Sequence, residues 1–114
     1  QDSGVDLSKN NVLLYTGGSC RWMGKIPSDR NCVFDLSREG DEQIVAQTEK
    51  NADMGAPETL SSFLNFAYEH YPSEHYGLIF WDHGGGPVYG FGYDEWVKDE
   101  DAANLVNVIS TICD

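Results

Sequence analysis

The chain has 114 residues, of which 40% are hydrophobic and 23% charged, so it is neither an intrinsically disordered sequence nor a long multidomain chain. Its 19 acidic residues outnumber 7 basic ones and give a formal net charge of −12, which argues against nucleic acid and anionic membrane surfaces as partners. The charge favours a basic ligand through its long-range field, although solubility is the simpler interpretation.

Targeting segments and metal-binding cysteines are not evident. No run of about 18 apolar residues predicts a membrane span, and the polar residues 1–11 lack the apolar region of a signal peptide. The three cysteines, Cys20, Cys32 and Cys113, lack the spacing of a zinc site and do not decide the redox compartment. A disulfide between Cys20 and Cys32 in a surface loop is an alternative to two free thiols.

The first half of the chain predicts two strands. Residues 11–16 (NVLLYT) form a short apolar run that ends in two glycines, which is typical of a buried strand. Residues 19–38 are mixed in character, and the turn signal at 27–29 favours a long loop. Residues 43–48 (QIVAQT) predict a second, weaker strand.

The middle of the chain predicts a helix followed by a strand. Pro57 suits a first helical position, apolar residues recur on one face through residue 71, and Pro72 ends the helix. Residues 76–81 (YGLIFW) lack polar alternation, as do strands covered on both faces. Strand, helix and strand predict a right-handed βαβ unit and therefore an α/β fold with a mostly parallel sheet.

The C-terminal part of the chain suggests an incomplete fold. Residues 87–95 predict a hairpin, and apolar residues at helical spacing predict a helix from about 101 to 114. Three strands are few for a sheet covered on both faces, and the last helix has no end signal. We therefore expect a second polypeptide, or a continuation of this one, to complete the fold.

His83 and the three glycines after it form the candidate site. The histidine follows a predicted strand, and ligand sites in open α/β sheets lie beyond the carboxyl ends of strands. Its imidazole exchanges protons near neutral pH, and the glycines leave backbone N–H groups accessible for an oxyanion hole. One alternative is a polar residue beside a flexible loop. Another, a phosphate-binding loop, lacks the expected lysine and hydroxyl residue.

Three segments together, NVLLYTGGS, the stretch from NADMGAPETL to FWDHGGG, and GFGYDE, resemble the clostripain family of cysteine peptidases, most closely over residues 51–95. The resemblance implies a caspase-like, mostly parallel sheet flanked by helices, with residues 1–114 as the N-terminal portion of the peptidase domain. It implies that His83 is the catalytic histidine and that the Gly84 N–H stabilises the oxyanion. Asp82 also matches the family pattern, but alternation along a strand would point its side chain away from His83. Gly17, Gly18 and Ser19 are expected to line the same cleft.

The family's nucleophile, a cysteine that follows an alanine at the end of the next strand, has no counterpart in this sequence. Cys113 follows Ser-Thr-Ile on the apolar stripe of a predicted helix, which disfavours it. Family members are often cut into two associated chains. The resemblance therefore implies that this chain is the histidine-bearing light chain, and that a heavy chain of the same precursor carries the nucleophilic cysteine.

The resemblance also implies a substrate and a location. The substrate would be a peptide bond after Arg or Lys, bound by an acidic pocket on the missing chain, and the protein would be secreted or at the cell surface of a bacterium. No cofactor is needed for the chemistry and no metal site is predicted. Some family members depend on calcium, and an acidic cluster offers oxygen ligands, although a solvated loop is the simpler interpretation. The cluster comprises Asp94, Glu95, Asp99, Glu100 and Asp101.

Two other functions stay open at this point. A caspase-like module without a nucleophile would bind peptides without cleaving them. A hydrolase that pairs His83 with Ser19 or another hydroxyl would respond to serine reagents and not to thiol alkylation.

Overall fold

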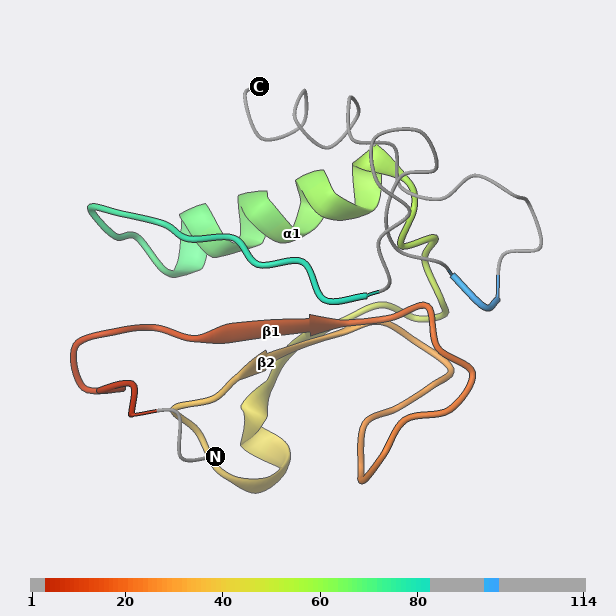
Figure 1. Cartoon of the computed structure of the whole chain (residues 1–114), viewed down its shortest axis with the longest axis horizontal. Coiled ribbons are helices and arrows are strands. Elements are labelled where there is room, and N and C mark those ends of the chain that lie inside the picture. The colour runs from red at the N-terminus through yellow and green to blue at the C-terminus, as the bar shows by residue number, and fades with distance from the viewer. Residues whose placement is uncertain (1–3, 83–93, 97–114) are drawn as a thin grey trace.

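The structure, a computed structural model, describes residues 4–82 and 94–96. In chain order these residues form strands β1 (Leu13–Thr16) and β2 (Cys32–Asp35), a 3-10 helix η1 (Gly40–Gln43), strand β3 (Ile44–Gln47) and helix α1 (Pro57–His70) (Figure 1). The predicted strands at 11–16 and 43–48 and the predicted helix at 57–71 are confirmed, each within two residues of the observed ends. The α/β class is confirmed with them.

The three strands form an antiparallel sheet in the order β1-β2-β3. Leu14 lies opposite Phe34 between β1 and β2, and the β2–β3 register shifts between Val33 and Phe34. All four residues of β2 are buried, as expected for a central strand that pairs on both edges. β2 lies inside the segment predicted to be a loop, so that prediction is wrong there. Its apolar run, residues 32–34, has three residues between Asn31 and Asp35, which is too short to show a clear period.

Helix α1 packs against β1 through aromatic contacts. The ring of Phe63 stacks on that of Tyr15 with centroids 4.9 Å apart, and Ala67 is buried. Pro57 begins the helix and Glu58 lies in its first turn, where a negative charge complements the helix dipole. The helix therefore covers the face of the sheet that carries Tyr15, while Leu14, which points to the opposite face, is exposed.

The end of α1 is tied to the end of β2 by a buried carboxylate. The Tyr71 hydroxyl donates to Asp35 Oδ2 at 2.8 Å, and Ser37 donates its backbone N–H and its hydroxyl to Asp35 Oδ1. Arg38 approaches the same carboxylate at 3.4 Å. Burial favours a higher pKa for Asp35, but the hydrogen bonds from Ser37 and Tyr71 and the charge of Arg38 outweigh it, so the pKa lies below its ordinary value.

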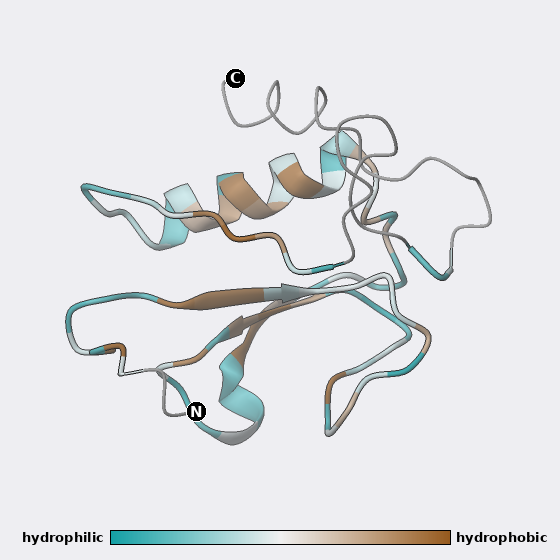
Figure 2. Cartoon of the chain, viewed as in Figure 1, coloured by the Kyte–Doolittle hydropathy of each residue, from teal (hydrophilic) through white to brown (hydrophobic). Residues whose placement is uncertain are grey.

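Residues 72–82 return alongside α1 without forming a strand. The ring of Tyr76 meets that of Tyr68 edge-on, with centroids 4.8 Å apart, and in Figure 1 the segment runs in the same direction as β1. Ile79 is 87% exposed and Trp81 is 96% exposed. Figure 2 shows this hydrophobic stretch in brown below α1.

The predicted strand at 76–81 is therefore wrong for the structure as described. Within residues 4–82 the sheet is antiparallel, and neither a parallel pair nor a βαβ unit is present. The physical reason is that strand formation depends on the sheet context as well as on apolar composition. The predictions of a hairpin at 87–95 and a helix at 101–114 fall mainly or wholly outside the described residues.

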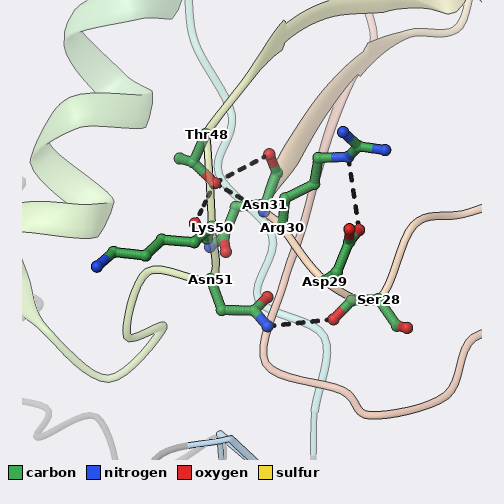
Figure 3. A network of polar contacts seen from close by, with 7 residues as sticks. All are labelled: Ser28, Asp29, Arg30, Asn31, Thr48, Lys50 and Asn51. Atoms are coloured by element: carbon green, nitrogen blue, oxygen red, sulfur yellow. Dashed lines mark hydrogen bonds and ion pairs between the residues drawn. The ribbon is translucent and has the colours of Figure 1, made fainter.

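A polar network fixes the strand ends nearest the candidate site (Figure 3). At the end of β3, the Thr48 hydroxyl accepts a hydrogen bond from the Asn31 N–H at 2.9 Å and donates to the Lys50 carbonyl at 2.6 Å. The Asn51 side chain donates to the Ser28 carbonyl at 3.2 Å. These bonds join the segment before β2 to the segment after β3. No helix in the described part of the chain has the length and apolar character to cross a membrane.

Candidate functional site

The candidate site lies at the carboxyl end of β1, where three loops meet. Residues 17–20 leave β1, residues 51–56 lead into α1, and residues 94–96 contact both of these segments. In Figure 1 the blue segment 94–96 lies beyond the arrowhead of β1, toward the same end of the molecule. In α/β proteins with parallel sheets, ligand sites lie beyond the carboxyl ends of the strands.

Gly17 is a point of close packing against a buried amide. Asn31 is fully buried, and its Nδ2 lies within hydrogen-bond distance of the Tyr15 hydroxyl, the Ala52 carbonyl and the Met54 sulfur. Its Oδ1 accepts from the Ala52 N–H at 2.9 Å. A Cβ on Gly17 would lie 2.5 Å from Asn31 Nδ2, so a larger residue does not fit without rearrangement.

Gly18 has two reasons to be glycine. Its φ is +77°, a left-handed conformation that side-chain-bearing residues rarely adopt. A Cβ at this position would also approach Met54 Cγ at 3.2 Å and Asp94 Cγ at 3.3 Å. The two glycines of the GGS motif are thus explained by packing and backbone conformation, whether or not they also line a cleft.

Asp94 is a buried acidic residue that joins two segments of the site. It is 8% exposed, and its Oδ2 accepts the Met54 N–H at 2.8 Å while its Oδ1 accepts the Trp96 N–H at 2.9 Å. A buried carboxyl group is stable only where donors surround it. The interpretation of Asp94 as part of a solvated acidic loop is therefore wrong, because both of its oxygens accept backbone hydrogen bonds.

Glu95 and Trp96 hold the loop that follows β1. The Glu95 N–H donates to the Gly18 carbonyl at 2.6 Å, and Glu95 Oε2 accepts from the Cys20 N–H at 2.6 Å and from the Ser19 hydroxyl at 3.2 Å. The Trp96 indole N–H donates to the Ser19 carbonyl at 3.2 Å. Every residue from 18 to 20 therefore has at least one hydrogen bond to the segment 94–96.

The two cysteines in the described part of the chain are poor nucleophiles, and they do not pair with each other. Cys20 is exposed and Cys32 is fully buried in β2, and both are free thiols. Loss of surrounding water raises the pKa of the Cys20 thiol, and the negative charges of Glu95 and Asp94 raise it further. Burial likewise raises the pKa of Cys32. A thiol with a raised pKa stays protonated at neutral pH and reacts slowly.

The predicted site residues divide between described and undescribed parts of the chain. Gly17, Gly18 and Ser19 lie together after β1, and the Ser19 hydroxyl also donates to the Arg21 carbonyl at 3.0 Å. His83 and Gly84 lie outside the described residues, as do Cys113 and the acidic residues 99–101. Within the described ranges, no group of three or more metal-ligating side chains comes together.

Sequence reasoning missed Asn31 and the role of Asp94. Asn31 stands between a charged turn and an apolar run, and nothing in its neighbours indicates complete burial. For Asp94 a signal was present: it belongs to GFGYDE, one of the segments that carry the family resemblance. Its hydrogen bond with Met54, 40 residues away in the sequence, was not readable from composition.

Comparison with protein families identifies the family of the chain. The model of the clostripain family matches residues 1–108, nearly the whole chain. Comparison with curated proteins and with solved structures finds no match. The α/β fold and the loops gathered at the end of β1 are compatible with a hydrolase. The chain belongs to the clostripain family, and the general class of the protein is therefore that of a cysteine peptidase.

Proposed function

We propose that this chain is the histidine-bearing part of a caspase-like cysteine endopeptidase that cleaves peptide bonds after Arg or Lys. The observation that carries the proposal is the family match over residues 1–108, which includes the HGGG motif at 83–86. In this proposal residues 1–114 are the N-terminal portion of the peptidase domain. A heavy chain of the same precursor supplies the nucleophilic cysteine.

The path of the chain supports His83 as the catalytic histidine. Residues 72–82 run in Figure 1 toward the end of the molecule at which β1 ends, and His83 follows Asp82 directly. Gly17, Gly18 and Ser19 lie at that end of β1. In the proposed complete enzyme, residues 76–81 pair as a strand within a larger, mostly parallel sheet. Burial of Ile79 and Trp81 in that sheet accounts for their exposure in this chain alone.

The proposed mechanism uses His83 as a proton carrier. His83 keeps the partner chain's cysteine as a thiolate, which attacks the carbonyl carbon of the scissile bond. The Gly84 N–H stabilises the resulting oxyanion. Collapse of the tetrahedral intermediate breaks the C–N bond, and the imidazolium protonates the leaving amine. His83 then takes a proton from water, which attacks the thioester and releases the acid.

A basic substrate is consistent with the charge of the chain. The net charge of −12 attracts cationic peptides at long range, and an acidic pocket on the heavy chain would pair with guanidinium or ammonium groups. A dependence on calcium, as in some members of the family, and a secreted or cell-surface bacterial location are further parts of the proposal, based on the family resemblance.

The test is hydrolysis of Arg and Lys peptide substrates by the assembled protein and its His83→Ala variant. We expect cleavage that is blocked by thiol alkylation, and a loss of kcat of at least about 100-fold in His83→Ala. His75→Ala is the matched control, because His75 is exposed and lies in the same return segment. Retention of activity by His83→Ala would refute the assignment. Complete inactivity of the assembled wild-type protein would favour a peptide-binding module.

The hydroxyl-nucleophile alternative makes a separate prediction. The Ser19 hydroxyl is hydrogen-bonded to the Arg21 carbonyl and to Glu95 Oε2, so its proton faces one acceptor two residues along the chain and one in the segment 94–96. We expect Ser19→Ala to retain cleavage and the wild-type protein to resist serine-directed reagents. Inactivation by such a reagent, with Ser19 modified, would favour the alternative.

A further inference from the structure

We propose that residues 94–96 form a positioning segment that holds the loop after β1, residues 17–20, in its substrate-binding conformation. This inference rests on the proposed peptidase function. It assigns to Asp94, Glu95 and Trp96 a role that acts through the loop and not through contact with the reacting atoms. The inference is based on the hydrogen bonds of these three residues to two loops near the end of β1, residues 17–20 and residues 51–56.

Several hydrogen bonds join the segment 94–96 to the loop after β1. Glu95 bonds to Gly18, Ser19 and Cys20 through its N–H and its carboxylate, and Trp96 bonds to Ser19 through its indole N–H. Two of these bonds measure 2.6 Å. Short loops without such bonds are usually among the least stable parts of a fold, so these contacts decide which conformation the loop adopts.

Asp94 forms a buried bridge between the segment 94–96 and the loop before α1. Its two oxygens accept N–H groups from Met54, in the loop before α1, and from Trp96, in its own segment. Burial at 8% exposure makes each bond costly to lose, because the carboxylate oxygen that accepts it would be left without a donor. The bridge therefore fixes the segment 94–96 to the loop at 51–56, and through Glu95 to the loop after β1.

Gly18 packs closely against Asp94. Its backbone lies so close to Asp94 that a Cβ would lie 3.3 Å from Asp94 Cγ, and its left-handed φ further disfavours larger residues. The two segments thus interlock by shape as well as by hydrogen bonds. A change at either side is expected to displace the other.

The segment 94–96 lies close in the sequence to the proposed catalytic histidine. Asp94 follows His83 by 11 residues, so the chain that carries the proposed histidine is anchored at its far end by this segment. A displacement of about 1 Å in a substrate-positioning group can reduce the rate by about 100-fold. A fixed loop after β1 would therefore serve catalysis without any of these residues touching the substrate.

The experiment compares Asp94→Ala, Asp94→Asn and Glu95→Ala with wild type in the assembled protein. Asp94→Asn keeps the size of the side chain and one acceptor oxygen, so it should be milder than Asp94→Ala. Glu42→Ala is the control, because Glu42 is an exposed acidic residue in η1. Amide hydrogen exchange and peptide hydrolysis are both measured.

We expect exchange of the Cys20, Met54 and Glu95 amides to be about tenfold faster in Asp94→Ala, with β2 unchanged. We expect kcat/KM to fall by about 10- to 100-fold, mainly through kcat. Asp94→Asn should lie between Asp94→Ala and wild type in both measurements, and Glu42→Ala should match wild type.

Two results would overturn the inference. Unchanged exchange at Cys20 and Met54 would show that the segment does not hold the loops. Faster exchange with unchanged kcat/KM would show that the loop conformation does not matter for the reaction. An inactive wild-type protein would count against the proposed function instead, and exchange alone would then decide whether residues 94–96 fix the loop.

Discussion

Strand β2 and the segment 76–81 have similar apolar sequences and opposite environments. In β2, Val33 and Phe34 are buried between two neighbouring strands. In the segment 76–81, Ile79 and Trp81 are almost fully exposed. Both segments contain residues that favour strands. The difference is the neighbour: β2 has β1 on one edge and β3 on the other, whereas no strand of the described chain pairs with 76–81.

The comparison teaches that apolar character indicates where surface must be covered, not what covers it. A continuous apolar run is typical of a strand inside a parallel sheet that is covered on both faces. The pattern therefore predicts both the extended conformation of the run and the presence of neighbouring elements that cover it. Because exposed apolar stretches of this kind mark interaction sites, the segment 76–81 supports the proposed association with a second chain.

The largest expected effect on stability is at the centre of the sheet. Phe34→Ala removes a buried aromatic side chain and should lower the free energy of unfolding by about 3–5 kcal/mol. Urea unfolding followed by circular dichroism measures the change. Leu14→Ala, directly opposite on β1 but exposed, is the control and should cost about 1 kcal/mol or less. Equal losses in the two variants would contradict the described burial.

The next effect concerns the carboxylate that joins β2 to α1. Tyr71→Phe removes the hydroxyl that donates to Asp35, and should lower the free energy of unfolding by about 1–2 kcal/mol. Asp35→Asn should cost a similar amount, and a double-mutant cycle should show coupling between the two changes. Additive losses would mean that this hydrogen bond does not contribute to stability.

The same pair predicts a dependence of stability on pH. The Asp35 pKa is lowered from 3.8, so its contribution is complete above about pH 4 and is lost as the pH falls through the folded-state value. Burial, together with the hydrogen bond to Asp35, raises the pKa of Tyr71 from 10.0, so that contribution is lost above about pH 10. Unfolding measured from pH 2 to 7 should therefore show a smaller acid-induced loss in Asp35→Asn than in wild type. An identical loss would contradict this assignment.

The smallest effect on the stability of this chain is expected in the exposed segment. Ile79→Ser should change the free energy of unfolding of the separated chain by no more than about 0.5 kcal/mol. In the assembled protein the same change should weaken association of the two chains, because it places a polar group in the proposed interface. Size-exclusion chromatography and native mass spectrometry measure the association. Unchanged association would argue that the segment is not an interface.

Much of the local structure was predictable from the sequence. Pro57, the spacing of the apolar residues after it and Pro72 defined α1, and the apolar run before Gly17 defined β1. β2 was not predictable because its apolar run has only three residues between Asn31 and Asp35, which are too few to show a period. The antiparallel pairing was not predictable either, since strand direction depends on the path of the loops between strands.

The candidate site was predictable in part: the sequence motifs indicated the family, but they did not indicate the hydrogen bonds that hold the loops of the site together. The family resemblance is confirmed by the match over residues 1–108, while the roles of His83 and Gly84 stay predictions. The hydrogen bonds that Asp94 accepts from the Met54 N–H and Glu95 accepts from the Cys20 N–H join residues 40 and 75 positions apart. Such contacts depend on the tertiary fold, which short-range patterns do not encode.

The most direct test of the central claim is to identify the nucleophile by labelling. The assembled protein is treated with a thiol-reactive peptide probe that carries Arg at the cleavage position, and the modified residue is located by mass spectrometry. We predict one labelled cysteine on a second polypeptide, outside residues 1–114, and no labelling in His83→Ala. Labelling of Cys20, Cys32 or Cys113, or labelling that does not require His83, would contradict the account.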